Sequence, residues 1–276
     1  MMHGLWRRFR RNRAATAGFA FLLLIVAIAA FAPFLYPRNP FAIVGQPFLP
    51  PGGAFLLGTD SLGRDVAAGL AHGARVSLLV GLIATASAVL IGTVLGAFAG
   101  YYGGVIDDVL MRTTEFFQTI PSFIFVIVLV AILSPSMVSI VIAIVVVSWP
   151  PIARLVRGEF LAIRSRDYVQ AAIGLGERDF PLMFRQILPN ALSPIIVTGS
   201  LMIATAILIE SSVSFLGLGD PNMMSWGFMI GSGRSFLRDA WWLCAIPGIA
   251  ILLTVLSINL VGEGLNDALN PRLRVL

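Results

Sequence analysis

Long uncharged stretches alternate with short arginine-bearing segments along the whole chain. The uncharged stretches cover residues 14–37, 76–106, 116–153, 186–209 and 240–262. A helix needs about 20 apolar residues to span a bilayer. The third stretch has 38 residues, too many for one helix, and Ser134-Pro135-Ser136 interrupts it, so it predicts two spans, the first beginning near Asp108. The pattern therefore predicts six transmembrane helices.

The composition of the chain indicates that lipid, and not water, surrounds most of it. Hydrophobic residues make up 58% of the sequence and charged residues only 12%, about half the share that soluble proteins carry. So little charge cannot cover a water-soluble surface. The sequence therefore predicts an all-α membrane protein embedded in a lipid bilayer.

The arginines are divided unevenly between the two predicted sides of the membrane. Fourteen of the 19 basic residues, all of them arginine, lie on the side of the chain termini: Arg7, Arg8, Arg10, Arg11, Arg13, Arg112, Arg154, Arg157, Arg164, Arg166, Arg178, Arg185, Arg272 and Arg274. The opposite side has Arg38, Arg64, Arg75, Arg234 and Arg238. The positive-inside rule predicts that both termini are cytoplasmic. The net charge of +5 follows from this bias, and we expect no nucleic-acid binding.

The first uncharged stretch admits two interpretations. Its arginine-rich start, apolar run and Ala30-Phe31-Ala32 resemble a cleavable signal peptide. However, the run is long enough to span, and Pro33 directly after Ala32 disfavours cleavage, so we expect a retained anchor. Residues 1–75 are then an N-terminal cytoplasmic tail, the anchor and an external segment, residues 76–264 the transmembrane core, and residues 265–276 a cytoplasmic tail.

The chain lacks the residues that nucleotide, metal and hydrolytic sites need. Without a lysine it cannot form the phosphate-binding loop whose lysine reaches the nucleotide phosphates. His3, His72 and Cys244 have no zinc-ligand spacing, and no Ser-His-carboxylate triad is visible. We therefore expect a non-catalytic chain that binds no metal or cofactor itself.

A polar segment at residues 157–190 separates the fourth and fifth predicted spans. Ser165 or Asp167 is expected to cap a short helix that ends at Gly174 and Gly176. Asp179 can start a second helix, with Pro181 tolerated in its first turn. Its apolar face would consist of Phe180, Phe184, Ile187 and Leu188.

Small residues gather at the turn of this segment. Ala171, Ala172, Gly174 and Gly176 would let another backbone approach closely, which favours docking into a protein groove over lying on lipid. An interfacial hairpin without a partner is the alternative. Docking predicts that Ala172→Glu blocks assembly or import.

These residues resemble a known family motif. The pattern is similar to the E-A-A, x3, G, x9, I-x-L-P loop of the integral membrane subunits of ATP-binding-cassette importers, with Gln170 in place of the leading Glu and Gln186 in place of the Ile. The resemblance implies the type I importer fold and a loop that docks into a separate ATPase subunit. The contacts are expected from Tyr168, Gln170, Ala171, Ala172, Gly174, Gly176 and Arg178.

Other stretches resemble the C-type permease of dipeptide and oligopeptide importers. They include LGTDSLGRD at residues 57–65, FLGLG at residues 215–219 and NLVGEGLNDALNPR at residues 259–272. The resemblance implies peptide import across the bacterial inner membrane with a B-type permease, two ATPase subunits that bind ATP and Mg, and an external substrate-binding protein. Nickel complexes, glutathione and some sugars are alternative substrates within the same architecture.

Several other positions have a structural and a functional interpretation. Asp60, Arg64, Asp65 and Arg75 form either a solvated external face or a receptor contact, with Asp60 or Ser61 capping a short helix. Glu210 is a locally hydrogen-bonded group or a pathway residue, and the first interpretation predicts that Glu210→Gln leaves transport largely intact. A proton- or sodium-coupled transporter would need more intramembrane charges than Glu210. An ATP-independent channel or a membrane scaffold remains the alternative of another class.

Three patterns predict packing rather than chemistry. Small residues recur every four positions in the second span and predict close helix packing. They are Ala84, Ala88, Gly92, Gly96 and Gly100. Asp107, Asp108, Arg112 and Glu115 favour ion pairing or solvation at the start of the third span. Trp226, Trp241 and Trp242 are expected to form an external interfacial belt.

Overall fold

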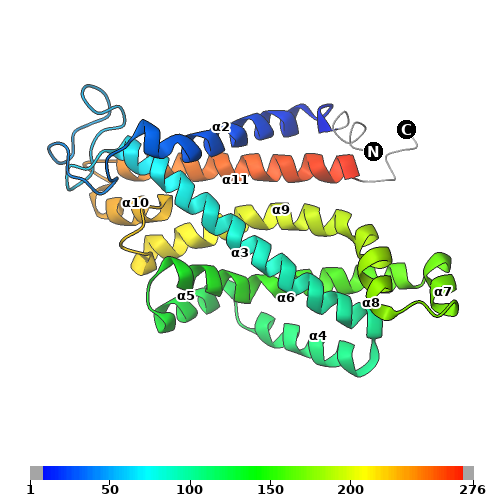
Figure 1. The fold of residues 1–276 in the computed structure, drawn as a ribbon. Helices are drawn as coiled ribbons and strands as arrows, with labels where there is room; N and C mark the ends of the chain where they lie inside the picture. The colour runs from blue at the N-terminus through cyan, green and yellow to red at the C-terminus, as the bar shows by residue number, and fades with distance from the viewer. Residues whose placement is uncertain (1–8, 270–276) are drawn as a thin grey trace.

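The structure, a computed structural model, describes residues 9–269 and shows a helical bundle (Figure 1). Its principal helices are α2 (Arg13–Leu35), α3 (Val66–Tyr102), α4 (Gly104–Thr119), α5 (Ser122–Leu133), α6 (Met137–Arg164), α7 (Asp167–Gly174), α9 (Leu188–Val213), α10 (Trp226–Gly233) and α11 (Trp242–Leu269). Short pieces are α8 (Asp179–Pro181), the π-helical η1 (Leu182–Ile187) and η2 (Ser214–Leu218), and the 3₁₀ turn η3 (Arg234–Phe236). Arg7, Arg8, Arg272, Arg274 and His3 lie outside the described residues.

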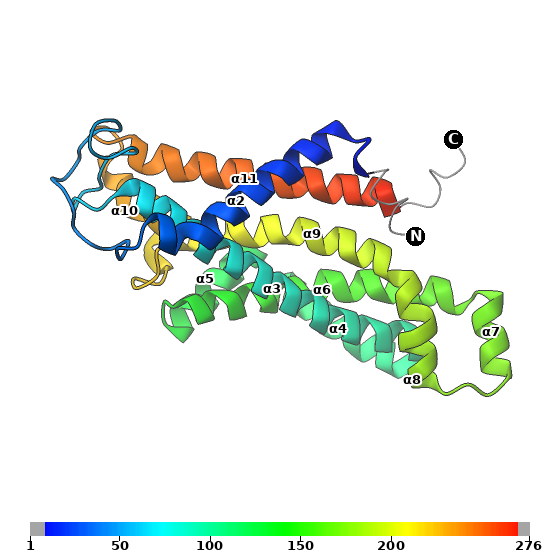
Figure 2. The same ribbon diagram turned by 45° about the horizontal axis from the view of Figure 1, so that its top comes forward.

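The bundle has two distinct ends. The start of α2, the end of α11, the turn between α3 and α4, and α7 lie at one end, while residues 37–65 and α10 lie at the other (Figures 1 and 2). Asn12 Nδ2 donates to Asp267 Oδ2 over 3.2 Å, which ties the beginning of α2 to the end of α11. The two groups of described arginines thus fall at opposite ends, as the sequence predicts.

Six membrane crossings are present when α4 and α5 are counted as one. Five helical segments are long and apolar enough to cross on their own, and α4 and α5 pass that test only together. The α4–α5 pair is bent by 84°, so the third crossing is not the straight span that the sequence predicts. The reason is Pro121, which lacks an amide donor and forces Ile120 into an extended conformation (φ −89°, ψ 131°). The break expected at residues 134–136 is confirmed, because α5 ends at Leu133 and Ser136 caps α6.

The second helix of the polar segment is not separate from the fifth span. Helical structure runs from Asp179 through the π turn η1 and α9 into η2, where Gly217 (φ 87°, ψ 10°) breaks it. In Figure 2 the α8–η1 piece stands across the bundle end and α9 runs along the bundle. Its buried side chains are Leu182, Met183 and Ile187, and Phe184 and Leu188 are partly buried against the same cluster. The predicted apolar face is therefore confirmed for Phe184, Ile187 and Leu188 and was wrong for Phe180, which is 67% exposed.

The stripe of small residues in α3 packs against α6, which confirms its predicted role. Ala84, Ala88, Gly92, Gly96 and Gly100 are all buried. A Cβ atom added to Gly92 would lie 2.7 Å from the carbonyl oxygen of Trp149, and one added to Gly100 would lie 2.6 Å from that of Arg157. The two helices therefore touch backbone to backbone along much of their length.

The first helix packs against the last. A Cβ atom added to Gly18 would lie 2.9 Å from Cβ of Leu260, and one added to Gly264 would lie still closer to Cβ of Ala15. Such close contact builds the first helix into the bundle.

The second helix begins earlier than its uncharged stretch. Asp65 Oδ1 accepts the amide of Ala67 at 2.9 Å and caps α3, which starts at Val66 and includes His72 and Arg75. The predicted boundary at residue 76 therefore falls inside α3. A spanning helix can include polar residues at its outer end. A boundary drawn from uncharged residues alone leaves those residues out.

Candidate functional site

The most exposed element at the arginine-rich end is α7 with the turn that follows it. Gly176 adopts φ +79°, a conformation that favours glycine, and the amide of Glu177 donates to the carbonyl of Ala172 over 3.1 Å. The glycine end of this helix is thus confirmed. The predicted side-chain cap was wrong, because Arg166 precedes α7 without a capping bond and Ser165 Oγ donates to the carbonyl of Ala162 instead.

One side of α7 is seated in the protein. Val169 is fully buried with Leu182, Met183 and Ile187, and Ala172 is partly buried against the same cluster. These partners belong to η1, which continues into α9, so α7 is packed directly against the start of a membrane-spanning helix.

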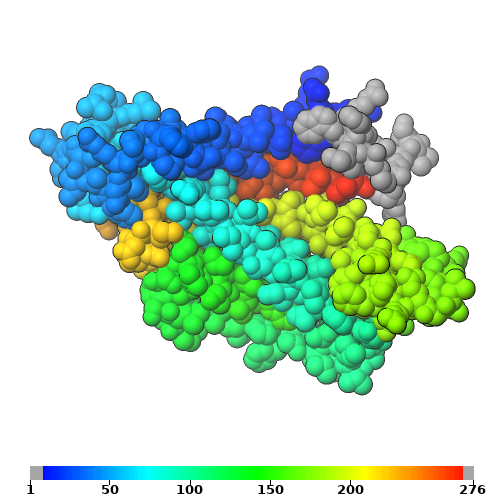
Figure 3. Space-filling view, viewed as in Figure 1, coloured from blue at the N-terminus to red at the C-terminus, as the bar shows by residue number. Residues whose placement is uncertain are grey.

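The other side of α7 projects from the bundle (Figure 3). Ala171, Gly174 and Gly176 are exposed, and a Cβ atom added to either glycine would meet nothing within 4 Å. Leu175 is 89% exposed between the two glycines, beyond Ile173 at 38%. We call residues 171–176 the α7 tip. Tyr168, Gln170 and Arg178 are also exposed and flank it.

Gln170 has a partner that the glutamate of the family motif could not use in the same way. Its Nε2 donates to the carbonyl oxygen of Arg164 over 2.8 Å, at the end of α6. An ionised carboxylate has no hydrogen to donate, so it would repel this carbonyl. Gln170 therefore joins α7 to α6, a role that depends on the amide and not on a charge.

The polar segment is also joined to α3. Tyr101 Oη donates to Asp179 Oδ1 over 2.7 Å, and the Arg164 guanidinium lies 5.3 Å from the Tyr101 ring centroid. Arg157 donates two hydrogen bonds of 2.5 Å to Asp107 of α4. Asp107 thus pairs across helices and not with Arg112, as its spacing had allowed. No pattern in the sequence indicates a role for Tyr101, whose partner is 78 positions away.

The external residues chosen from the sequence serve mainly to hold their own segment together. Asp60 Oδ1 accepts the amides of Leu62 and Arg64, each at 2.8 Å, so Asp60 shapes a turn and does not cap a helix. Arg64 lies 5.0 Å from the Phe41 ring centroid. Arg75 is exposed on α3 and makes no hydrogen bond or ion pair with the described residues.

The tryptophans at the external end do not form a belt. Trp226 and Trp242 are buried, and their Nε1 atoms donate to the carbonyls of Leu70 and Thr59. Only Trp241 is exposed, at 58%. The prediction was wrong for the two buried rings, because the folded external segment and α3 supply carbonyl partners for them.

Glu210 lies in a fully buried cluster of serines near the external end. Its carboxylate accepts hydrogen bonds from Ser225 (2.7 Å), Ser214 (2.9 Å), Ser211 (3.3 Å) and Ser77 (3.5 Å). Ser225 caps α10, and the other three serines come from η2, α9 and α3, so one side chain joins four parts of the chain. The burial favours the structural interpretation of Glu210 over the pathway interpretation.

We expect Glu210→Gln to retain transport within tenfold of the native level. A glutamine keeps one acceptor oxygen, and the serine hydroxyls can rotate to accept from its amide nitrogen. Uptake measured at matched membrane levels tests this, with Glu210→Ala as the contrasting variant that leaves all four hydroxyls without their acceptor. A greater than tenfold loss in Glu210→Gln at normal membrane levels would make Glu210 a pathway residue.

Comparison with known proteins identifies the family. The model of the "Binding-protein-dependent transport system inner membrane component" matches residues 92–275, and that of the "N-terminal TM domain of oligopeptide transport permease C" matches residues 1–51. The chain belongs to the family of binding-protein-dependent transport system inner membrane components. An inner membrane component of this kind works with ATPase and substrate-binding partners, and the predicted location in the inner membrane is confirmed.

Individual relatives of this inner membrane component cover nearly all of it. It is 42% identical to the di/tripeptide transport system permease protein DppC of Pseudomonas aeruginosa, over 98% of this chain and 91% of the relative. It is 40% identical to the glutathione transport system permease protein GsiD of Pectobacterium atrosepticum, over 98% and 90%. Both likenesses include the external segment and the α7 tip.

Solved structures confirm the expected type I importer fold of the component. A chain of the inward-facing MetNI methionine ABC transporter superimposes with a TM-score of 0.59 at 16% identity, over 71% of this chain and 93% of that one. A chain from an amino acid ABC transporter crystallised with histidines gives 0.56 at 16%, over 72% and 92%.

Proposed function

We propose that this chain is the permease subunit of an ATP-driven importer of di- and oligopeptides, and that the α7 tip docks into a separate ATPase subunit. The observation that carries the docking proposal is the contrast between the two sides of α7. One side is fixed to η1 by Val169, and the other presents the exposed Leu175 between two open glycines at the arginine-rich end.

The direction of transport follows from the topology. The start of α2, the end of α11 and α7 lie at the arginine-rich end of the bundle, and the positive-inside rule supports a cytoplasmic location for that end. ATP and Mg bind to the partner subunits, and this chain performs no catalysis, since it has no lysine for a phosphate-binding loop. A B-type permease completes the pathway, and an external binding protein delivers the peptide at residues 37–65 and α10.

The mechanism uses the helical segment from Asp179 through η1 and α9 to Val213. Closure of two ATPase subunits around ATP moves α7, the cluster around Val169 passes the movement to η1 and α9, and the far end of α9 carries Glu210 and the start of η2. Coupling of this kind requires two global states of the transporter, and both the α7 end and the Glu210 end of this segment must affect the balance between them. ATP hydrolysis resets the ATPase subunits and returns the segment to its starting position.

Peptides are the first substrate class because relatives that transport them are similar over the whole chain. Glutathione is the second candidate, on the likeness to GsiD. Uptake of a labelled dipeptide into proteoliposomes, with excess unlabelled glutathione as competitor, distinguishes the two.

The docking proposal predicts that the α7 tip is needed for capture of the ATPase. Residues 173–176, the part of the α7 tip beyond Ala172, are replaced by a Gly/Ser linker, which leaves Val169, Ala172 and the η1 cluster in place. We expect the soluble ATPase to stop co-purifying and ATP-dependent uptake to be lost, while the permease still reaches the membrane. Unchanged co-purification would contradict docking at α7, flux without ATP would indicate a channel, and absence of stimulated ATPase activity in the native complex would indicate a scaffold.

A further inference from the structure

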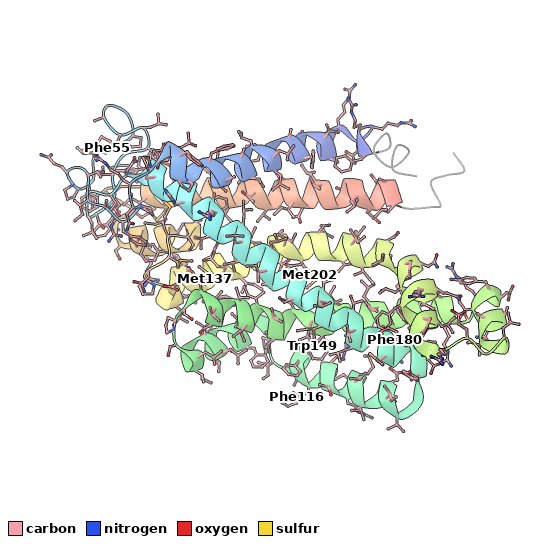
Figure 4. All side chains as sticks on the ribbon, viewed as in Figure 1. Phe55, Phe116, Met137, Trp149, Phe180 and Met202 are labelled. Atoms are coloured by element: carbon pink, nitrogen blue, oxygen red, sulfur yellow. The ribbon has the colours of Figure 1, made fainter. Side chains whose placement is uncertain are left out.

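Tyr101 of α3 contacts three parts of the chain around α7. Its side chain is 5% exposed and belongs to the cluster that seats α7, together with Val169. Its Oη donates to Asp179 Oδ1 over 2.7 Å at the start of α8, and the Arg164 guanidinium at the end of α6 lies 5.3 Å from its ring centroid. In Figure 4 Phe180, the residue after Asp179, lies beside this end of α3. One buried side chain of α3 therefore contacts the chain just before α7, within α7 and just after it.

The other end of α3 contacts α10 and the cluster around Glu210. Ser77 Oγ donates to Glu210 Oε2 over 3.5 Å and accepts the amide hydrogen of Trp226 over 3.3 Å. Trp226 Nε1 donates to the carbonyl of Leu70 over 2.9 Å. Ser77 lies about 36 Å along α3 from Tyr101. A single helix thus connects the support of α7 with the opposite end of the bundle.

The build of α3 suits it to carry a displacement over this distance. It has 37 residues, contains no proline, and touches the backbone of α6 at Gly92 and Gly100. By contrast, α9 is preceded by the π turn η1 and contains Pro194. A π turn and an internal proline are places where a helix bends. Coupling between distant sites is carried by rigid, packed elements, so α3 is a stiffer connection than α9.

We propose that Tyr101 is a positioning residue for ATP-driven transport: its hydrogen bond to Asp179 fixes α7 to α3, and α3 passes the movement of α7 to α10 and the Glu210 cluster. This inference rests on the proposed function, in which the ATPase moves α7, and it adds α3 as a second route beside α9. A movement of α7 that breaks the bond between Tyr101 and Asp179 would leave α3 in place.

Removal of the Tyr101 hydroxyl separates this role from folding. A phenylalanine keeps the ring that packs in the cluster and that Arg164 covers. Asp179 is exposed, so water replaces the lost hydroxyl and no buried acceptor is left without a partner. The thermal unfolding midpoint of Tyr101→Phe should therefore match that of the native chain.

The number of peptides imported per ATP hydrolysed tests the proposal. It is measured with labelled dipeptide in proteoliposomes that contain both permeases, the ATPases and the binding protein. We expect the Tyr101→Phe complex to retain its ATPases and to hydrolyse ATP, while this ratio falls about threefold or more. Asp179→Leu should have the same effect. Asp179→Asn should keep the native ratio, because its amide oxygen still accepts the hydrogen bond.

Tyr36→Phe is the matched control, because it makes the same chemical change at the opposite end of the bundle. The Tyr36 hydroxyl makes no hydrogen bond with the described residues, so this variant should import as the native chain does. The double variant Tyr101→Phe/Asp179→Leu should be no worse than either single variant, since both changes remove the same bond.

A native ratio in Tyr101→Phe, or an additive loss in the double variant, would overturn the proposal and leave the proposed function intact. Loss of the ATPases from the Tyr101→Phe complex, or a lowered unfolding midpoint, would also overturn it, because Tyr101 would then act through docking or folding. Absence of ATP-dependent uptake in the native complex would count against the proposed function instead.

Discussion

Leu175→Asp is expected to abolish ATP-dependent uptake without loss of folded permease. Leu175 is 89% exposed and is not part of the described cluster that seats α7, so the change leaves that seat unaltered. In the docked complex the leucine would be buried against the ATPase, and a carboxylate there would lose its water without gaining a partner. Interface residues of this kind cost about 2 kcal/mol or more when removed, which is over tenfold in affinity.

Two measurements separate docking from folding for this variant. Membrane levels and the thermal unfolding midpoint of the isolated permease should match the native values, while ATPase co-purification and uptake fall. Leu175→Met is the matched control and should retain both, because it keeps the apolar volume. Uptake by Leu175→Asp within about twofold of native would show that the α7 tip is not a docking surface.

The structure also shows why Leu175 is a better probe than Ala172. The small-residue pattern had suggested Ala172→Glu, but Ala172 is partly buried beside Val169 in the cluster that seats α7. A glutamate there would disturb the support of the helix as well as its docking face. The exposed side of an eight-residue helix cannot be assigned without knowing where its neighbours lie.

Local rules predicted much of the architecture. Long uncharged runs located the spans, Ser136 marked the start of α6, the four-residue spacing of Ala and Gly identified the packed face of α3, and Gly176 ended α7. Each of these depends on residues close together in the chain. The bend at Pro121 was accessible to the same rules, but it lies inside an uncharged run that satisfied the length criterion.

The remaining features depend on partners that are distant in sequence. The four serines around Glu210 come from four parts of the chain, with Ser77 133 positions away. Trp242 is buried because residue 59 supplies a carbonyl 183 positions away. Gln170 was noticed as a departure from the family motif, yet its bond to the carbonyl of Arg164 requires the actual angle between α6 and α7. Tertiary contacts of this kind have no periodic signature.

Gly92→Ala is expected to remove most of the folded permease from the membrane. The added methyl group would lie 2.7 Å from the Trp149 carbonyl oxygen and 2.7 Å from Cβ of Ile152. Both atoms are fixed to the α6 backbone, so no side-chain rotation relieves the clash and the two helices must separate. Overpacking of this kind lowers the free energy of unfolding by about 1–3 kcal/mol. Here it also separates the backbones of α3 and α6, which touch along much of their length.

Gly158→Ala is the matched control because it makes the same chemical change in α6. A Cβ atom there meets nothing within 4 Å, and alanine favours helix by about 1 kcal/mol over glycine, so this variant should be as stable as the native chain or slightly more so. The thermal unfolding midpoint in detergent and the amount of monodisperse protein after size-exclusion chromatography report the difference. Equal stability of the two variants would mean that α3 and α6 can move apart without loss of stability. Close packing along the small-residue stripe would then not be needed to hold α3 and α6 together.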